Sequence, residues 1–554
     1  MRRLSYILLL AFLVGGCLKS ASQTIYDAAN LTERDLNGTA RFIGMGGAMG
    51  ALGGDISVMG TNPAGTGIYR SNDAALSFSF SDFGFDSEYV GNKIDRNTSR
   101  VYFDQAGIVF ANRLGTITPV RYVNFGFGYK RVKSFHRDMR MYGSLGDYSQ
   151  TFQMASQAEG LTSWGSAPYR NDDIGWLSAL GYDGYLITDL VSESELSDYD
   201  DYEEYTLDGE QVQNTAGELM YRTPGLYRGM YTDGTATFLS RERGGIDEFD
   251  FNVSINVNNR VYLGFTVGMY AVNYKKYSFY DEDYGNGEGY NLRSWSKITG
   301  AGIDLKVGAI FRPIASSPLR IGLAISTPVF YDLNYKTGAY LASDVINFLD
   351  TDNPSGVEAG EVGHYDISTF NEVGGYMNRG FRLHTPWTFN DSLGHTVGKK
   401  WAIGAEYEYQ DYAATKFRDT NGHARAFAYE NSTTDMLRGV STLRVGVEFK
   451  PVPEVALRVG YNYRSAIFSD QAYKDLPYNS IQTDTDFANT KQLGVYTAGI
   501  GYRGSHFYAD FAYKYSSRKA DFYPIDMYDG SSLVQATAEK QKRSQVMMTI
   551  GVKF

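Results

Sequence analysis

Apolar and polar side chains alternate with a period of two along much of this chain. Residues 249–258, 401–409 and 457–464 each place large apolar side chains on one face and polar or small side chains on the other. This period predicts β-strands that have an apolar medium on one side only. About fourteen such strands can be counted between Ala74 and Phe554, so the pattern predicts an all-β protein.

The connections between these strands alternate between short and long. An even number of antiparallel strands, with short turns at one end and long loops at the other, is typical of a transmembrane β-barrel of an outer membrane. A soluble β-sandwich does not sort its loops so regularly. The expected turns are 111–119, 257–260, 312–318, 392–400, 450–454 and 502–506, and the long loops lie near 85–98, 136–245, 280–289, 336–376, 413–437, 467–488 and 518–540.

The requirements of a membrane favour a closed sheet. After residue 22 the chain contains no apolar run of 18 residues, which excludes a helical membrane span. In lipid every backbone N–H and C=O group must be paired, and a closed barrel meets this requirement. We therefore predict a transmembrane antiparallel β-barrel of about 14 strands, surrounded by the lipids of a bacterial outer membrane and carrying long extracellular loops.

The first 22 residues have the pattern of a secretory signal peptide. Arg2 and Arg3 precede the apolar run 6–16, and small residues before position 23 offer a cleavage site. A second interpretation stays open, because Cys17, the only cysteine, follows a run that loosely resembles a lipoprotein box and would then be lipidated. Cleavage after Ser22 instead leaves a mature protein without a thiol.

The rest of the chain divides into a short leading segment and the barrel. Residues 23–73 precede the first strand, and residues 74–554 carry the barrel pattern. The longest loop, 136–245, is predicted to form a small cap on the outer mouth, because residues 173–191 show a helical spacing of apolar side chains.

Composition argues against several classes of function. The net charge of −11 disfavours a nucleic-acid partner. None of the six histidines lies in an H-E-x-x-H motif and no serine lies in G-x-S-x-G, so we expect no enzyme, no cofactor and no metal site. A barrel hydrolase that assembles its catalytic groups from distant strands is a minor alternative. The acidic tracts 281–288 and 350–356 lack the full spacing of a calcium loop, so solvated outer loops are favoured over calcium sites.

A run of small residues lies directly before the first strand. Its glycines do not have the spacing of a dinucleotide-binding loop, and no strand precedes them. Residues 41–80 are similar to the N-terminus of the FadL/TodX family of outer-membrane transporters of hydrophobic compounds. Further along, residues 121–132 resemble the third strand of that family, and residues 298–313 with 319–330 resemble its central hairpin.

The resemblance implies that residues 23–73 form a hatch inside the barrel. In that family a small-residue segment ending in Asn-Pro-Ala precedes the first strand and plugs a fourteen-stranded barrel. The residues suit this role, because glycine and alanine permit close backbone approach, Pro63 fixes its own backbone, and Asn62 can bond its own turn. The expected hatch residues are Gly44, Gly46, Gly47, Gly50, Gly53, Gly54, Asn62, Pro63, Ala64 and Gly65.

The resemblance also implies a route for a ligand. A hydrophobic molecule binds at the outer mouth, passes to a deeper pocket and leaves by diffusion through a lateral opening near a kinked third strand. Gly126 and Gly128 could bend that strand, so the expected opening comprises Phe125, Gly126, Phe127 and Gly128. The expected partners of a ligand carboxylate are Arg41, Lys130 and Arg131, with Lys133 and Arg137 as further cations.

Two functions follow from the sequence. The first is a monomeric passive transporter of long-chain fatty acids, aromatic hydrocarbons or other hydrophobic small molecules. The second is a barrel of the same fold that acts as an adhesin, a receptor or a part of a surface complex through its outer loops. A transporter predicts an apolar pocket that continues from the mouth to a gap in the wall beside the third strand. An adhesin predicts a filled lumen and a flat aromatic surface on the loops.

Overall fold

The computed structural model describes residues 23–115, 118–207, 209–526 and 535–554. The expected signal peptide and Cys17 lie outside the described residues. Among the residues that are described, no helix is both long and apolar enough to cross a membrane.

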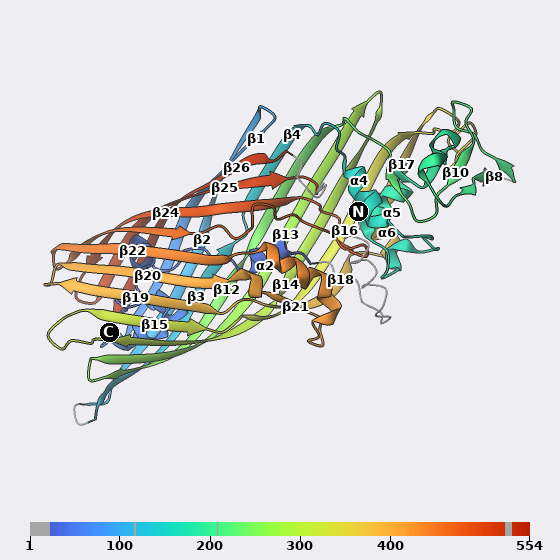
Figure 1. Ribbon diagram of the computed structural model, residues 1–554. Helices are drawn as coiled ribbons and strands as arrows, with labels where there is room; N and C mark the ends of the chain where they lie inside the picture. Colours follow the sequence, from blue (N-terminus) through green and yellow to red (C-terminus); the bar gives the residue numbers. More distant parts are fainter. Residues whose placement is uncertain (1–22, 116–117, 208, 527–534) are drawn as a thin grey trace.

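Over the described part of the chain, fourteen antiparallel strands close into a barrel (Figure 1). The first and last strands complete the wall, since β1 pairs with β26 from Asp73–Lys553 to Glu88–Ala538. The predicted all-β barrel is therefore confirmed. Some barrel strands consist of two consecutive parts, written here with a plus sign. The strands are β1 Asp73–Tyr89, β2 Asn92–Arg113, β3 Val120–Ser134 + β4 Arg137–Ser144, β12 Thr235–Val257, β13 Val261–Gly285, β14 Glu288–Phe311, β15 Arg320–Ser326 + β16 Phe330–Ile346, β18 Met377–His384 + β19 Thr388–Val397, β20 Trp401–Asp411 + β21 Lys416–Arg418, β22 Gly439–Val452, β23 Val455–Arg464, β24 Phe487–Arg503, β25 Phe507–Tyr523 and β26 Thr537–Lys553.

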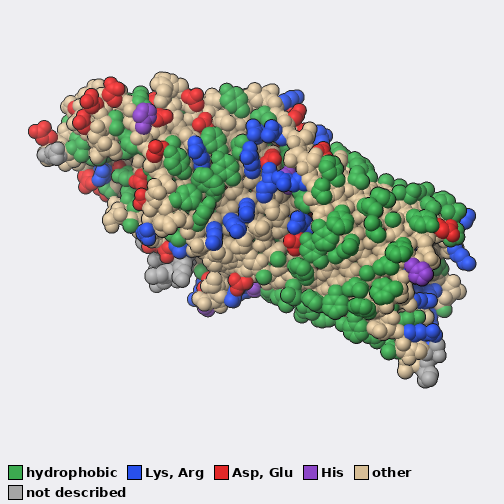
Figure 2. Space-filling model, turned by 180° about the vertical axis from the view of Figure 1, so that it is seen from behind, with side chains coloured by type: hydrophobic (Ala, Val, Ile, Leu, Met, Phe, Trp, Pro, Cys, Tyr) green, Lys and Arg blue, Asp and Glu red, His purple; other side chains and the backbone are tan. Residues whose placement is uncertain are grey.

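The period-two pattern sorts side chains between the outside and the inside of the wall. In β20 the side chains of Trp401 and Ile403 are 43% and 44% exposed, whereas Glu406 points inward and is buried. Figure 2 shows hydrophobic side chains gathered over the half of the barrel that carries the short turns. A closed sheet with such an exterior satisfies its backbone in lipid. The chain is thus an outer-membrane β-barrel.

The long connections gather at the other end of the barrel. The connection from β4 to β12 spans residues 145–234, which is narrower than the expected 136–245 because both strands continue beyond the membrane-facing part of the wall. Of the helical spacing expected in 173–191, only α5 is helical, and the later part of this range forms the short strands β5 and β6. The elements of this end are α4 Gln150–Ala158, η3 Pro168–Arg170, α5 Trp176–Asp183, β5 Ile187–Thr188, β6 Leu190–Ser192, η4 Glu193–Asp198, β7 Glu203–Glu204, β8 Thr206–Leu207, β9 Glu210–Gln211, β10 Met220–Arg222, β11 Arg228–Gly229, β17 Val362–Ser368, α6 Thr369–Val373, η5 Tyr412–Ala414, η6 Arg425–Phe427, α7 Ala428–Ser432 and η7 Thr433–Met436.

Residues 23–72, called here the N-terminal segment, run along the inside of the wall. They contain α2 (Ile25–Thr32), α3 (Ala40–Gly44), η1 (Ile56–Gly60) and η2 (Pro63–Ile68). Helix α2 lies toward the long loops, where Tyr26 stacks on Phe468 with ring centroids 4.7 Å apart. The segment ends at the short-turn side of the barrel, where the Asn72 N–H donates to the Phe554 carbonyl at 3.1 Å.

Candidate functional site

The expected hatch residues form the most compact part of the N-terminal segment. Gly46, Gly47, Gly53 and Gly54 have φ angles of 62°, 84°, 60° and 67°, a conformation that strains any residue with a Cβ atom. At the corner of η2, the Asn62 Oδ1 accepts the Ala64 N–H at 3.1 Å, as the sequence predicts. Pro63 follows at the first helical position. The small residues are therefore needed for the path of the backbone itself.

A belt of glycines on the inner wall faces this run of small residues. A Cβ atom at Gly404 would lie 2.1 Å from the Ala48 carbonyl oxygen, and one at Gly446 would lie 2.2 Å from that of Met45. On the opposite side of the lumen, a Cβ atom at Gly264 would lie 2.2 Å from the Pro63 carbonyl carbon. Neighbouring members pair across the strands, as Gly394 with Gly404, Gly404 with Gly446, and Gly446 with Gly460. Sequence reasoning missed this belt, although its signal is a glycine at an inward position of successive strands.

The pairing of β2 with β3 stops partway along both strands. The last paired residues are Gln105 and Lys130, although β2 continues outward to Asn92 and β3 with β4 continues to Ser144. Strand β3 then breaks at residues 135–136 before β4 begins. The wall therefore has a gap in its ladder beside the third strand, at the side where that strand is interrupted.

The N-terminal segment bonds to the edge of β3 just beyond the end of this pairing. The Asp35 N–H donates to the Val132 carbonyl at 2.7 Å, and the Ser134 N–H donates to the Asp35 Oδ2 at 3.1 Å. The Asn37 Nδ2 donates to the Arg131 carbonyl at 2.9 Å. Residues 35–37 thus occupy the inner side of the gap and satisfy backbone groups that β2 leaves unpaired.

The expected opening residues lie next to the gap and not within it. Phe125 to Gly128 are paired with β2 on one edge and with β12 on the other. Gly126 and Gly128 instead make room for the N-terminal segment, since a Cβ atom at these positions would lie 2.6 Å from the sulfur and 3.1 Å from the methyl carbon of Met59. The missing side chains at these two glycines accommodate a neighbour inside the lumen, and the bend expected there stays a prediction.

The expected carboxylate-binding cations already have carboxylate partners. Arg41 lies 3.2 Å from Glu448, Lys130 lies 3.1 Å from Glu248, and Arg131 lies 3.0 Å from Asp247. Each of these cations is therefore part of an internal ion pair.

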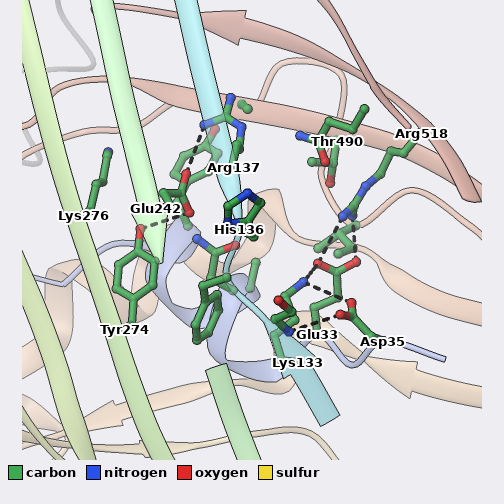
Figure 3. A pocket seen from close by; sticks show the side chains of 18 of the residues that line it. Glu33, Asp35, Lys133, His136, Arg137, Glu242, Tyr274, Lys276, Thr490 and Arg518 are labelled. Carbon is green, nitrogen blue, oxygen red and sulfur yellow. Dashed lines mark hydrogen bonds and ion pairs between the residues drawn. The ribbon is translucent and has the colours of Figure 1, made fainter. Parts of the chain in front are cut away.

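A cavity of about 190 Å³ lies on the long-loop side of the small-residue run, next to the break in the third strand (Figure 3). Its apolar lining includes Leu36, Phe83, Phe85 and Phe135. Its charged lining comes from both the N-terminal segment and the wall, and comprises Asp27, Glu33, Asp35, Lys133, Arg137, Glu242, Lys276, Lys474, Asp484, Asp486, Lys514, Arg518, Lys542 and Arg543. The cavity therefore offers an apolar side and an ionic side.

The connection from β23 to β24 covers the cavity on its outer side. Lys276 contacts Asp484 at 2.6 Å and Asp486 at 2.7 Å. The Trp176 N–H of the cap donates to the Ser480 carbonyl at 2.9 Å. This connection therefore ties the cap, the wall and the roof of the cavity together.

A second hollow lies on the lipid side of the wall, where the pairing of β2 with β3 ends. It measures about 760 Å³, and its lining is almost wholly apolar, including Leu76, Phe78, Ile108, Phe127 and Phe251. Two of the expected opening residues, Phe127 and Gly128, thus line an apolar surface directly beside the gap.

Over the described part of the chain, no cluster of three or more His, Cys, Asp or Glu side chains is arranged to hold a metal ion. The acidic tract 281–288 lies at the hairpin between β13 and β14. The tract 350–356 lies in the connection between β16 and β17.

Comparison with known proteins gives structural likenesses alone. No protein-family model and no curated protein matches the chain. The Pseudomonas putida toluene transporter TodX is 12% identical, with 94% of this chain and 99% of that chain covered and a TM-score of 0.46. A Pseudomonas aeruginosa FadL homologue is 11% identical, with 94% and 100% covered and a TM-score of 0.49. The Ralstonia pickettii toluene transporter TbuX is 13% identical, with 94% and 99% covered and a TM-score of 0.42.

The barrel is established by the strand pairing of the chain itself. The chain is thus similar, in sequence motif and in solved structures, to FadL- and TodX-type transporters of hydrophobic compounds.

Proposed function

We propose that this protein is a passive outer-membrane channel for hydrophobic small molecules, which leave the lumen sideways through the gap beside β3. Residues 23–72 act as its hatch in this proposal. The single observation that carries it is the interrupted pairing of β2 with β3, closed from inside by residues 35–37. Movement of one short stretch would free the cavity and unblock the gap at the same time.

The two hollows support this route. The inner cavity reaches Phe135 at the strand break, and the outer hollow begins where the ladder ends. A hydrophobic molecule in the gap would therefore meet apolar side chains on both sides of the wall. The inner cavity is smaller than the roughly 300–1,000 Å³ of a typical small-molecule site, so a long ligand requires the hatch to move.

Fatty acids and aromatic hydrocarbons are the ligands we propose to test. Cells that carry the protein should take up labelled oleate or toluene faster than matched cells that lack it. Equal uptake of both compounds in the two cell lines would contradict the transport proposal.

A second function is favoured by the covered mouth. The connection 465–486 and α5 lie over the cavity, which fits an adhesin or receptor that presents its loops and keeps its lumen closed. Deleting residues 465–486 separates the two functions. A transporter so altered should take up its ligand at least as fast as before, whereas an adhesin should show no uptake with or without this connection.

A further inference from the structure

Three lysines stand side by side on the outer face of the barrel wall. Lys275 of β13 is the direct pairing partner of Lys297 of β14, and Lys297 is the direct partner of Lys336 of β16. Residues next to them in the sequence point inward, since Ile298 and Tyr335 are both 1% exposed. The three side chains, called here the lysine row, therefore point outward from neighbouring strands that lie about 5 Å apart.

The lysine row has no counter-charge in the described part of the chain. Among the residues that the structure describes, none forms an ion pair or a hydrogen bond with any of the three amino groups. Arg243 of β12, the pairing partner of Lys275 on its other side, is held by Asp138 at 2.8 Å. Like charges directly opposite each other on neighbouring strands are destabilising. The wall thus carries three adjacent positive charges that lack an anion of their own.

The lysine row lies just beyond the membrane-facing part of the wall. Six residues nearer the short turns on the same strands, Met269, Ile303 and Phe330 form a parallel outward row and are 46%, 47% and 45% exposed. The next outward row contains the first charge, Asp332. The lysine row lies four residues further, which is about 10 Å along the membrane normal at the usual strand tilt. It therefore faces lipid headgroups, where Figure 2 shows Lys and Arg side chains gathered between the apolar half of the barrel and the long loops.

Polar and aromatic side chains border the lysine row on its two sides. Toward the membrane, the next outward positions are Asn273, Thr299 and Asn334. Toward the long loops, Tyr277 is paired with Trp295, and their ring centroids are 5.5 Å apart. Amide and hydroxyl groups bond sugar hydroxyl groups, and the apolar faces of sugar rings pack against aromatic rings. The surroundings of the lysine row therefore suit a sugar as well as a phosphate group.

The aromatic surface continues from Trp295 onto the long loops. The ring of Phe370 in α6 lies 5.4 Å from that of Trp295 and 5.0 Å from that of Tyr376, which is 54% exposed. Gly338, the pairing partner of Trp295, leaves room for this contact, since a Cβ atom there would lie 2.3 Å from the Phe370 ring. The rings thus form one continuous surface beside the lysine row.

We propose that the lysine row is a binding site for a phosphorylated glycolipid of the outer leaflet. Its acyl chains lie on the apolar row, its phosphate groups contact the three lysines, and its sugar rings pack against the aromatic surface. Phosphate oxygens accept charge-assisted hydrogen bonds from amino groups and supply the missing negative charge. An anionic phospholipid has one phosphate and no sugar ring, so it leaves the aromatic surface unused. The site lies on the outside of the wall and is separate from the route proposed for the transported molecule.

The test measures binding of diphosphoryl lipid A, an acylated disaccharide with two phosphate groups. The full-length protein in a non-ionic detergent is titrated with this lipid in mixed micelles, and native mass spectrometry quantifies the bound lipid. One basic side chain near an anionic lipid surface contributes about fivefold to binding, so the triple variant Lys275→Gln, Lys297→Gln, Lys336→Gln should bind about a hundredfold more weakly. The same three positions changed to Arg should keep the affinity within about threefold. Unchanged binding in the Gln variant, or an equal loss in the Arg variant, would overturn the proposal.

A matched control removes the same charge at the other end of the barrel. Arg260, Lys399 and Lys400 are exposed in the short turns, and changing all three to Gln should leave lipid A binding within about twofold. If this control loses as much affinity as the lysine-row variant, net charge explains the binding and the site is refuted.

Thermal unfolding separates binding from a structural role. In detergent without lipid A, the Gln variant of the lysine row should unfold at the same temperature as the natural protein or a higher one, because opposed like charges are removed and no partner is lost. Lipid A should raise the unfolding temperature of the natural protein more than that of the variant. A lower unfolding temperature of the variant in detergent alone would show a structural role and contradict the proposal.

Related lipids identify the occupant. Dephosphorylated lipid A and phosphatidylglycerol should each bind the natural protein at least tenfold more weakly, because the first lacks phosphate and the second lacks sugar rings. Inorganic pyrophosphate should not displace bound lipid A at equal concentration, because it has no acyl chains. Equal binding of the dephosphorylated lipid would refute the role of the lysines, and equal binding of phosphatidylglycerol would refute a glycolipid. None of these outcomes depends on uptake of oleate or toluene, so they are distinguishable from the outcome for the proposed function.

Discussion

The N-terminal segment, which is the hatch of the proposed function, is held to the wall in two different ways along its length. Residues 44–67 are held by a close backbone fit against wall glycines such as Gly404 and Gly446, and by hydrogen bonds from the wall such as Asn252 to the Pro63 carbonyl at 3.2 Å and Thr266 to the Met59 carbonyl at 3.1 Å. Residues 33–37 are held by charge, through the ion pairs of Glu33 and Asp35 and three hydrogen bonds to the edge of β3.

The difference between these two stretches indicates what each can do. A backbone-to-backbone fit has no substitute among small molecules, so in the proposed function residues 44–67 are the part that seals the lumen. The carboxylate of an ion pair can be replaced by another anion of similar geometry, so residues 33–37 can be released from the wall. In the proposed function, the sealing part (residues 44–67) and the releasable part (residues 33–37) are therefore separate in sequence, and they differ in the kind of contact that each makes with the wall.

The largest effect is expected where the fit of residues 44–67 is broken. Gly404→Leu combined with Gly446→Leu places side chains where the carbonyl groups of Ala48 and Met45 lie, at a cost of roughly 2–6 kcal/mol for two overpacked sites. Reconstituted vesicles should then leak small polar solutes about as fast as with residues 44–60 deleted. The matched control is Gly494→Leu, because the nearest atom to a Cβ there is 3.8 Å away. If vesicles that carry the double variant do not leak, the sealing role is refuted.

A smaller effect is expected from the charged stretch. Arg464→Gln removes a contact to Glu33 at 3.3 Å and a hydrogen bond to the Arg34 carbonyl at 3.0 Å, while Lys133 and Arg518 remain. Hydrogen bonds to charged groups contribute about 1.5–3 kcal/mol, so vesicles should show a partial leak. The leak should lie below that of the glycine variant, because Lys133 and Arg518 still hold Glu33. A leak equal to that of the glycine variant would erase the distinction between the two stretches.

The smallest effect is expected from pH. Burial alone would raise the pKa of Glu33, but Arg518, Lys133 and Arg464 outweigh it and hold this pKa well below the usual range. Burial likewise opposes the Lys133, Arg543 and Lys514 charges that lower the pKa of Asp35. A lowered carboxyl pKa contributes stability above the usual carboxyl range, and this stability is lost as pH falls through the lowered value.

The leak should therefore be the same at pH 8 and at pH 5, and should rise only below about pH 4. Solute release from vesicles over this range measures it. In the Glu33→Gln, Asp35→Asn variant the acid-induced rise should disappear. A rise already present near pH 6 would mean that these carboxylates do not hold the hatch.

Much of the barrel follows from local pattern. The alternation in 401–409 predicts β20 and the direction of Trp401 and Ile403, because each side chain position depends only on its neighbours along the strand. The turns after β12, β22 and β24 lie where the sequence places them. The Asn62–Pro63 corner likewise depends on adjacent residues, and its hydrogen bond to the Ala64 N–H is present.

The site depends on partners that local pattern does not reveal. Gly126 and Gly128 suggest a bend, but local pattern does not reveal that Met59 of the N-terminal segment lies against both of them. Arg41, Lys130 and Arg131 suggest free cations, but carboxylates of β22 and β12 pair with them. Glu33 and Asp35 lie in a stretch without any motif. Only the cations that surround them in the structure show that they contribute to the site.

The sequence by itself determined the barrel, the alternation of its strands and loops, and the presence of a small-residue segment ahead of it. The spacing of apolar, polar and small residues along the chain is enough to specify these features. The tertiary structure alone decided where the wall is open and what holds the hatch. Lys133, Arg464 and Arg518 converge although they are far apart in sequence, and the ladder of the consecutive strands β2 and β3 stops at Gln105 and Lys130, short of the outer ends of both strands. Such long-range contacts depend on which strands become neighbours when the sheet closes, and spacing along the chain does not encode that choice.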